Sequence, residues 1–116
     1  MKFTKLYTGD DQKSYFQEVE VDIGSIQPLG NYSKPISTTG MMLRDFKQGS
    51  EFDWHNAPQP QYIIYLEGEM EVVASGGETR TFRPGDILLA SDLTGEGHIS
   101  RTLTDGKSVI VTTMKI

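Results

Sequence analysis

Hydrophobic and polar residues alternate with a period of two along much of the chain, and no segment shows sustained helical spacing. Residues 14–24 divide into two faces, one with Tyr15, Val19, Val21 and Ile23, the other with Phe16, Glu18, Glu20 and Asp22. Residues 69–75 alternate in the same way and are expected to bury Met70, Val72 and Ala74 while exposing Glu69 and Glu71. Residues 62–66, "YIIYL", are apolar on both parities, which is typical of a strand buried on both faces.

Turn signals separate these segments. Gly76-Gly77 and Asp105-Gly106 suit two-residue hairpin turns, and Pro84-Gly85 suits the centre of a type II turn. Short strands at regular spacing, with twelve glycines, predict an all-β sandwich or barrel of antiparallel strands. We expect a single domain over 1–116. Residues 1–35 would form N-terminal strands and a loop that pair at a sheet edge or with a second subunit, and 36–116 the barrel core.

Composition narrows the classes of function. At 116 residues the chain can bury a core without disulfides, and it has no cysteine for disulfides, thiolate zinc sites or nucleophiles. The net charge of −5 argues against a nucleic-acid partner. The longest apolar run is too short to span a membrane, and no secretion signal is visible, so a cytoplasmic location is expected.

A specific spacing begins at Gly49. Five residues separate it from His55, and Ala57, Gln61 and Gly68 follow after gaps of one, three and six residues. A second block, residues 83–102, reads "RPGDILLASDLTGEGHISRT" and ends in a predicted strand.

The two blocks resemble the two motifs of the cupin superfamily, G-x5-H-x-H-x3-4-E-x6-G and G-x5-P-x-G-x2-H-x3-N. The resemblance covers about half of the chain and implies a single double-stranded β-helix, a jelly-roll-like barrel. His55 and His98 fall on family histidines, and Gly49, Gly68, Gly85 and Gly95 on family glycines. Two extra residues lie between Ser91 and His98. Four positions depart from the family pattern: Ala57 replaces a histidine, Gln61 a glutamate, Ser91 a proline and Thr102 an asparagine.

The resemblance implies a metal site, because cupins hold iron, manganese, nickel or zinc with histidines and a glutamate. Here His55, Gln61 and His98 could form a reduced set for a divalent ion, with Asp53 as a further ligand. The neutral amide of Gln61 would leave the ion's charge uncompensated, so an anionic ligand would help. The alternative is a pair of hydrogen-bonded histidines that line a pocket without metal.

We expect further pocket residues around this set, namely Trp54, Ala57, Tyr65, Ser100 and Thr102. Alternation along the strand turns Ser100 and Thr102 to the side of His98 and Arg101 away from it. Arg44 and Arg80 are taken as solvated surface residues.

Two functions fit this sequence. One is a metal-dependent enzyme of oxygenase, isomerase or lyase type that acts on a small, anionic organic molecule. The other is a metal-free module that binds or senses a small molecule. No serine nucleophile motif and no phosphate-binding glycine loop is present. The resemblance also implies a homodimer that pairs through edge strands.

Overall fold

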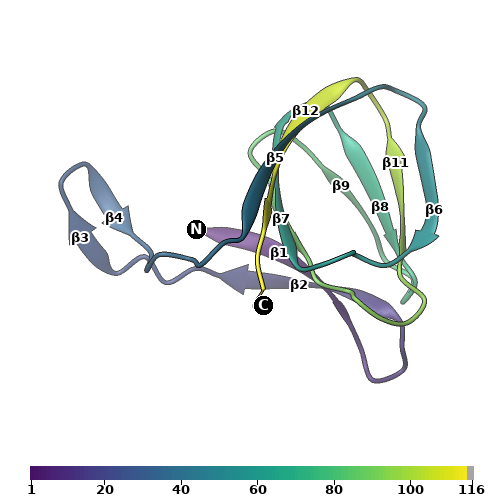
Figure 1. Ribbon diagram of the computed structural model, residues 1–116, viewed down its shortest axis with the longest axis horizontal. Helices are drawn as coiled ribbons and strands as arrows, with labels where there is room; N and C mark the ends of the chain where they lie inside the picture. Colours follow the sequence, from purple (N-terminus) through teal and green to yellow (C-terminus); the bar gives the residue numbers. More distant parts are fainter. Residues whose placement is uncertain (115–116) are drawn as a thin grey trace.

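Two twisted β-sheets face each other in the structure, a computed structural model that describes residues 1–114 (Figure 1). The larger sheet contains, in order, β2 (Ser14–Glu20), β1 (Lys2–Thr8), β10 (Ile87–Ala90), β7 (Gln61–Glu67), β12 (Gly106–Thr112) and β5 (Gly40–Phe46). The smaller sheet contains β6 (Glu51–His55), β11 (His98–Thr102), β8 (Met70–Ala74) and β9 (Thr79–Phe82). A separate two-stranded hairpin consists of β3 (Ser25–Gln27) and β4 (Gly30–Tyr32).

The predicted all-β, jelly-roll-like fold is confirmed, and none of the described residues is helical. All strand pairs are antiparallel except β1 with β10, so the opening segment pairs at a sheet edge of its own chain. The barrel is not closed by hydrogen bonds, because the two sheets share no strand within the described residues. No helix of these residues is long and apolar enough to cross a membrane.

The core lies between the inner faces of the two sheets. Met70, Val72 and Ala74 alternate inward from β8, as predicted, and each is at most 5% exposed. Leu6 of β1 and Leu88 of β10 meet them from the larger sheet and are equally buried. The inner surfaces therefore exclude water over most of their area, and the polar groups among them need partners.

One of the two predicted hairpin turns is wrong. The chain does reverse at Gly77, which joins β8 to β9 with a φ of 110°. Gly106, however, does not close a hairpin, because β11 and β12 belong to different sheets. Its hydrogen side chain is needed instead for close packing, since a Cβ there would meet the Phe46 ring at 2.3 Å. The predicted type II turn is confirmed: Gly85 has a φ of 93°, and the amide of Asp86 donates to the carbonyl of Arg83 at 2.9 Å.

Strand β7 departs from the prediction that it is buried on both faces. Its inward residues Ile63 and Tyr65 are buried, whereas outward Tyr62 and Ile64 are half-buried and Leu66 is 53% exposed. The outer side of the larger sheet is therefore apolar without being fully covered by its own chain.

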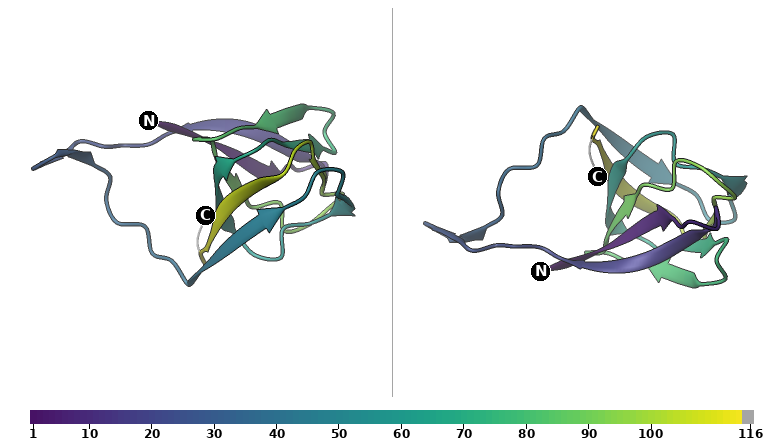
Figure 2. Two further views of the ribbon diagram at one scale, coloured as in Figure 1. Left: turned by 90° about the horizontal axis from the view of Figure 1, so that it is seen from above. Right: turned by 90° about the horizontal axis from the view of Figure 1, so that it is seen from below.

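Residues 21–39, which we call the arm, connect β2 to β5 and carry the β3–β4 hairpin (Figures 1 and 2). Because β2 and β5 are the two edge strands of the larger sheet, the arm passes from one edge of that sheet to the other. Both views in Figure 2 show it projecting away from the barrel. The functional site is on the opposite, inner side of the sheet.

Candidate functional site

A cavity of about 460 Å³ lies between the inner faces of the two sheets. Most of its wall is apolar and includes Phe46, Ile63, Tyr65, Met70, Val72, Leu88 and Ala90. Its polar lining residues are Arg44, Ser50, Glu51, His55, Asn56, Gln61, His98, Ser100 and Thr102. An apolar space with a few polar groups is the usual form of a small-molecule site.

The two histidines meet at one end of this cavity. His55 ends β6 and His98 begins β11, and the antiparallel register places the two residues opposite each other. Their ring centroids are 4.2 Å apart, with an angle of 56° between the rings. The ring of Phe52 stacks on His55 with a centroid distance of 3.7 Å. Sequence positions 43 residues apart are thus joined by strand pairing.

A glycine allows this end of the cavity to form. Gly97 precedes His98, has a φ of 76° and lies so close to β6 that a Cβ would meet the His55 carbonyl oxygen at 2.1 Å. Only glycine combines this backbone conformation with such a close approach. The loop before β11 can therefore pass directly against the end of β6.

The His55 ring is oriented by its own strand. Its Nδ1 lies 2.7 Å from the carbonyl oxygen of Asp53, which can only accept, so Nδ1 carries the proton and Nε2 is left to accept in the neutral ring. Burial lowers the pKa of His55 below 6.5, and the nearby His98 lowers it further, while the Asp53 carbonyl opposes this. His55 therefore favours the neutral form.

His98 is held by a buried carboxylate. Its Nδ1 lies 2.6 Å from Oδ2 of Asp92, which is fully buried, and the hydroxyl of Ser14 donates to the same oxygen at 2.7 Å. The second oxygen of Asp92, Oδ1, is buried and has no hydrogen-bond partner among the described residues. These hydrogen bonds link Ser14 of β2, Asp92 of the loop that follows β10, and His98 of β11. They fix the orientation of the His98 ring.

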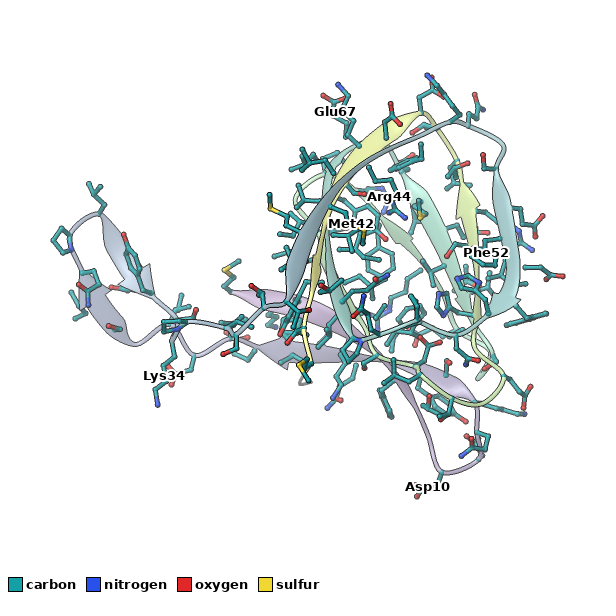
Figure 3. The ribbon with its side chains drawn as sticks, in the orientation of Figure 1. Asp10, Lys34, Met42, Arg44, Phe52 and Glu67 are labelled. Carbon is teal, nitrogen blue, oxygen red and sulfur yellow. The ribbon has the colours of Figure 1, made fainter. Side chains whose placement is uncertain are left out.

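Arg44 lies toward the other end of the cavity. In the strand register Arg44 is opposite Ser108, and Ser108 is opposite Tyr65. Tyr65 contacts Met70, which lies at one end of β8, whereas His98 pairs with Ala74 at the other end. Figure 3 shows Arg44 on β5 and Phe52 on β6, across the space between the sheets.

The Arg44 guanidinium is only partly satisfied. Its Nε donates to the hydroxyl of Ser108 at 2.9 Å, and the group lies 5.5 Å from the centroid of the Phe46 ring. Its Nη2 is buried and has no hydrogen-bond partner among the described residues. Burial raises the pKa of Tyr65 to about 12, although the neighbouring Arg44 opposes the rise, so Tyr65 stays neutral. A cationic donor thus faces the cavity without a matching acceptor.

The structure brings most of the sequence-predicted residues together. Seven of them line the cavity: His55, Ala57, Gln61, Tyr65, His98, Ser100 and Thr102. The Thr102 hydroxyl is already used, because it bonds the Ser50 amide at 2.8 Å and the Lys47 carbonyl. Arg101 faces outward, as predicted, and pairs with Glu51 and Glu71.

Trp54 and Asp53 lie elsewhere than expected. Trp54 is 50% exposed and does not line the cavity, because it points to the other side of β6. Asp53 contributes its backbone carbonyl to His55, while its side chain is exposed and lies outside the cavity lining. The pairing between β6 and β11 is irregular next to His98. The alternation of inward and outward side chains along β6 is therefore interrupted before the strand ends at His55.

Sequence reasoning missed three polar residues that shape the site, Arg44, Asp92 and Ser14, and it wrongly took Arg44 as a solvated surface residue. Arg44 shares the parity of inward Phe46 in β5, and that signal could have identified it. Asp92 continues the inward parity of Leu88 and Ala90 just past the end of β10. Ser14 had no comparable signal, because its role depends on a contact with a residue 78 positions away.

The donor set suits a divalent ion only weakly. Among residues 1–114 no group of three histidine, cysteine or carboxylate side chains is arranged to hold a metal ion. The cavity supplies two imidazoles and the neutral amide of Gln61, and the Asp92 carboxylate is bound to His98. A carboxylate from a bound molecule would supply the missing negative charge.

Comparisons with known proteins support a cupin-type fold. A family model for the EutQ-like cupin domain matches residues 46–100, which include both histidines. Two proteins of Diaporthe leptostromiformis, phomopsin biosynthesis cluster proteins C' and D, are each 29% identical over 104 positions. The alignment covers 79% of this chain but 53% of each relative, so the chain spans about half the length of these curated relatives.

Solved structures with the same fold have little sequence identity to this chain. A protein assigned as ethanolamine utilization protein Q from Salmonella typhimurium matches with a TM-score of 0.55 and 16% identity, over 98% of this chain and 96% of that one. A conserved protein of unknown function from Streptococcus pyogenes matches with a TM-score of 0.55 and 15% identity, over 72% and 71% of the two chains. At these identities the likeness concerns the fold alone.

Proposed function

We propose that the cavity between the two sheets binds a small organic anion, because it is lined mostly by residues 46–100, the segment that matches the EutQ-like cupin domain. The acidic group of the ligand would pair with Arg44, and its other polar end would contact His55, His98 and Gln61. The unpartnered, buried Nη2 of Arg44 is the observation that carries this proposal.

A buried donor atom of a cation is costly when it has no partner, because it has lost its hydrogen bonds to water without gaining new ones. A ligand carboxylate removes that cost and adds charge-assisted hydrogen bonds. The carboxylate that lines the cavity, Glu51, already pairs with Arg101 on the outer face. The acceptor for Arg44 would therefore come from the ligand.

Size and wall chemistry limit the class of ligand. The cavity volume of about 460 Å³ is in the range of sites for metabolite-sized molecules. The apolar walls around Ile63, Val72 and Leu88 favour a ligand with a hydrocarbon middle part. The neutral form of His55 offers Nε2 as an acceptor for a ligand hydroxyl or amine, and Gln61 offers both a donor and an acceptor. We therefore favour a short carboxylic acid with a hydroxyl, amino or carbonyl group at its far end.

The test is a panel of small carboxylic acids and their neutral amides, measured by thermal shift and calorimetry with a chelator present. An acid that binds the folded state raises the melting temperature, and its amide binds at least about tenfold more weakly. Arg44→Gln should abolish the preference for the acid, whereas Arg83→Gln, a surface control paired with Glu69, should leave it unchanged. Equal binding of acids and amides by the unmodified chain would refute the proposal.

We also propose that a divalent ion, such as iron, manganese, nickel or zinc, binds weakly at the histidine end. Both imidazoles bond an oxygen through Nδ1, which is the outer-shell arrangement that orients histidine ligands and leaves Nε2 for a metal. His55, His98 and Gln61 would hold the ion, and a bound ion would polarise a ligand carbonyl or carboxylate.

The metal proposal is tested separately by titration of metal-free protein with manganese, nickel and zinc. Gln61→Glu supplies a carboxylate and should tighten metal binding at least about tenfold, whereas Gln17→Glu, on the exposed side of β2, should not. His55→Ala should remove the binding. If His55→Ala binds metal as well as the unmodified chain, the ion is not held here. Binding of acids with a chelator present would still stand.

A further inference from the structure

Both imidazoles at the histidine end of the cavity present a hydrogen-bond acceptor. Nδ1 of His55 donates to the carbonyl oxygen of Asp53 at 2.7 Å, and Nδ1 of His98 donates to the carboxylate of Asp92 at 2.6 Å. A neutral imidazole carries one N–H, so Nε2 of each neutral ring is an acceptor. The amide oxygen of Gln61, which also lines the cavity, is a third. This end therefore offers three acceptors to a ligand.

A buried negative charge lies behind these acceptors. The Asp92 carboxylate is fully buried, and within residues 1–114 it pairs with His98 rather than with a lysine or an arginine. Its Oδ1 has no hydrogen-bond partner within the same residues. With neutral imidazoles, the histidine end therefore has a net negative charge, whereas Arg44 gives the other end a positive charge. The cavity is suited to a ligand whose two ends have opposite charges.

The number of hydrogen-bond donors decides which ligand group fits the three acceptors. A carbonyl group has no donor, and a hydroxyl group has one. A primary ammonium group, like that of lysine, has three N–H donors and a positive charge. It can bond all three acceptors with charge-assisted hydrogen bonds and also balance the charge of Asp92. Among the far-end groups that suit this cavity, the ammonium is therefore the best match.

The separation of the two ends limits the length of the ligand. In β7, Gln61 lies at the histidine end, and Tyr65, four positions later, lies at the arginine end. In β8, Ala74 pairs with His98, and Met70, four positions earlier, contacts Tyr65. At about 3.3 Å per residue, both strands place the two ends about 13 Å apart. Side chains extend into this span from both ends, so a ligand of about half this length fits between them.

We propose that the ligand of this cavity is an ω-amino carboxylate with a chain of about six carbons, bound with its carboxylate at Arg44 and its ammonium at the three acceptors. Its hydrocarbon middle would lie against Ile63 and Val72, which line the cavity midway along β7 and β8. This inference rests on the proposed binding of a small organic anion and adds the chemical group at the far end of that anion.

Calorimetry with four six-carbon acids that differ only at the far end tests this proposal. The acids end in an amino, a hydroxyl, a methyl or a second carboxyl group. The amino acid should bind at least about tenfold more tightly than the hydroxy acid, because it makes more hydrogen bonds and all of them are charge-assisted. A chelator is present throughout, because a metal ion would use the same Nε2 atoms.

A variant at the histidine end provides a second readout. Gln61→Glu adds a carboxylate beside the ammonium, so it should tighten binding of the amino acid at least about tenfold and weaken binding of the dicarboxylic acid. Gln17→Glu adds the same charge on the exposed side of β2 and should bind all four acids as the unmodified chain does. Equal effects of the two substitutions would show that the ammonium does not lie at Gln61 and would overturn the inference.

The anion site and the ammonium site fail in different ways. Equal binding of acids and their neutral amides would refute the anion site at Arg44. If acids bind better than amides, but equally well with an amino, hydroxyl or methyl end, the anion site stands and the ammonium site is refuted. Tightest binding of the dicarboxylic acid would also overturn the inference, because it requires a protonated His98 that donates through Nε2.

Discussion

The two ends of the cavity are built in different ways. At the histidine end, Ser14, Asp92 and His98 form a buried chain of hydrogen bonds, and His55 is held by the backbone of β6. At the arginine end, Arg44 extends from edge strand β5, bonds Ser108 and leaves Nη2 without a partner among the described residues.

Because of this difference, we expect the histidine end to contribute mainly to stability and the arginine end mainly to ligand binding. Residues with satisfied, buried hydrogen bonds add to stability, and their loss leaves unmatched groups behind. A buried donor without a partner adds little or nothing to stability, but it gains a partner when a ligand arrives. Substitutions at the histidine end should therefore lower stability more than substitutions at the arginine end, which should mainly weaken ligand binding.

The largest effect on stability is expected at Asp92. Asp92→Ala removes the acceptor of both Ser14 and His98 and leaves two buried donors unmatched, so the free energy of unfolding should fall by about 3 kcal/mol. Urea denaturation at pH 7.5 measures the change. Asp92→Asn keeps one acceptor oxygen and should lose about half as much. Asp45→Ala, at an exposed position, is the control. A change below about 1 kcal/mol in Asp92→Ala would show that the chain of bonds does not support the fold.

A much smaller effect on stability is expected at Arg44. Arg44→Met loses the bond to Ser108 but also removes the unmatched Nη2, so the free energy of unfolding should change by less than about 1 kcal/mol in either direction. The same urea experiment, without ligand, measures it. If Arg44→Met were as destabilising as Asp92→Ala, the arginine end would be structural as well, and the contrast between the ends would disappear.

The smallest effect is the pH dependence that His55 contributes. Its pKa in the folded chain is below 6.5, so the unfolded chain binds more protons as the pH falls through that value. The free energy of unfolding therefore has its full contribution from neutral His55 above pH 6.5, and this contribution is lost as the pH falls from 6.5 through the pKa of the folded chain. Melting temperatures between pH 5 and pH 8 should show a shallower decline on the acidic side in His55→Gln. Identical curves for the two proteins would mean that His55 titrates normally.

The fold and one end of the site could be predicted from the sequence, because they depend on local patterns. Alternation along β8, the type II turn at Gly85 and the motif spacing of His55 and His98 are properties of short segments. Trp54, which we predicted to line the pocket, lies outside the cavity lining, because the irregular pairing next to His98 changes which β6 residues face inward. The Asp105-Gly106 turn was wrong because nothing local indicates that two consecutive strands join different sheets.

The amino-acid sequence by itself was enough to predict an all-β, cupin-like fold with a pocket around two histidines. Only the tertiary structure decided what accompanies them. Ser14 bonds Asp92, and Arg44 bonds Ser108. Both bonds join residues that are distant along the chain, so they form only when the strands and sheets have packed together. The contrast between the two ends of the cavity likewise depends on this packing, because Arg44 reaches the cavity from the larger sheet and the histidines reach it from the smaller one. Periodicity specifies which side of a strand is apolar, whereas what lies against that side is set by the whole fold.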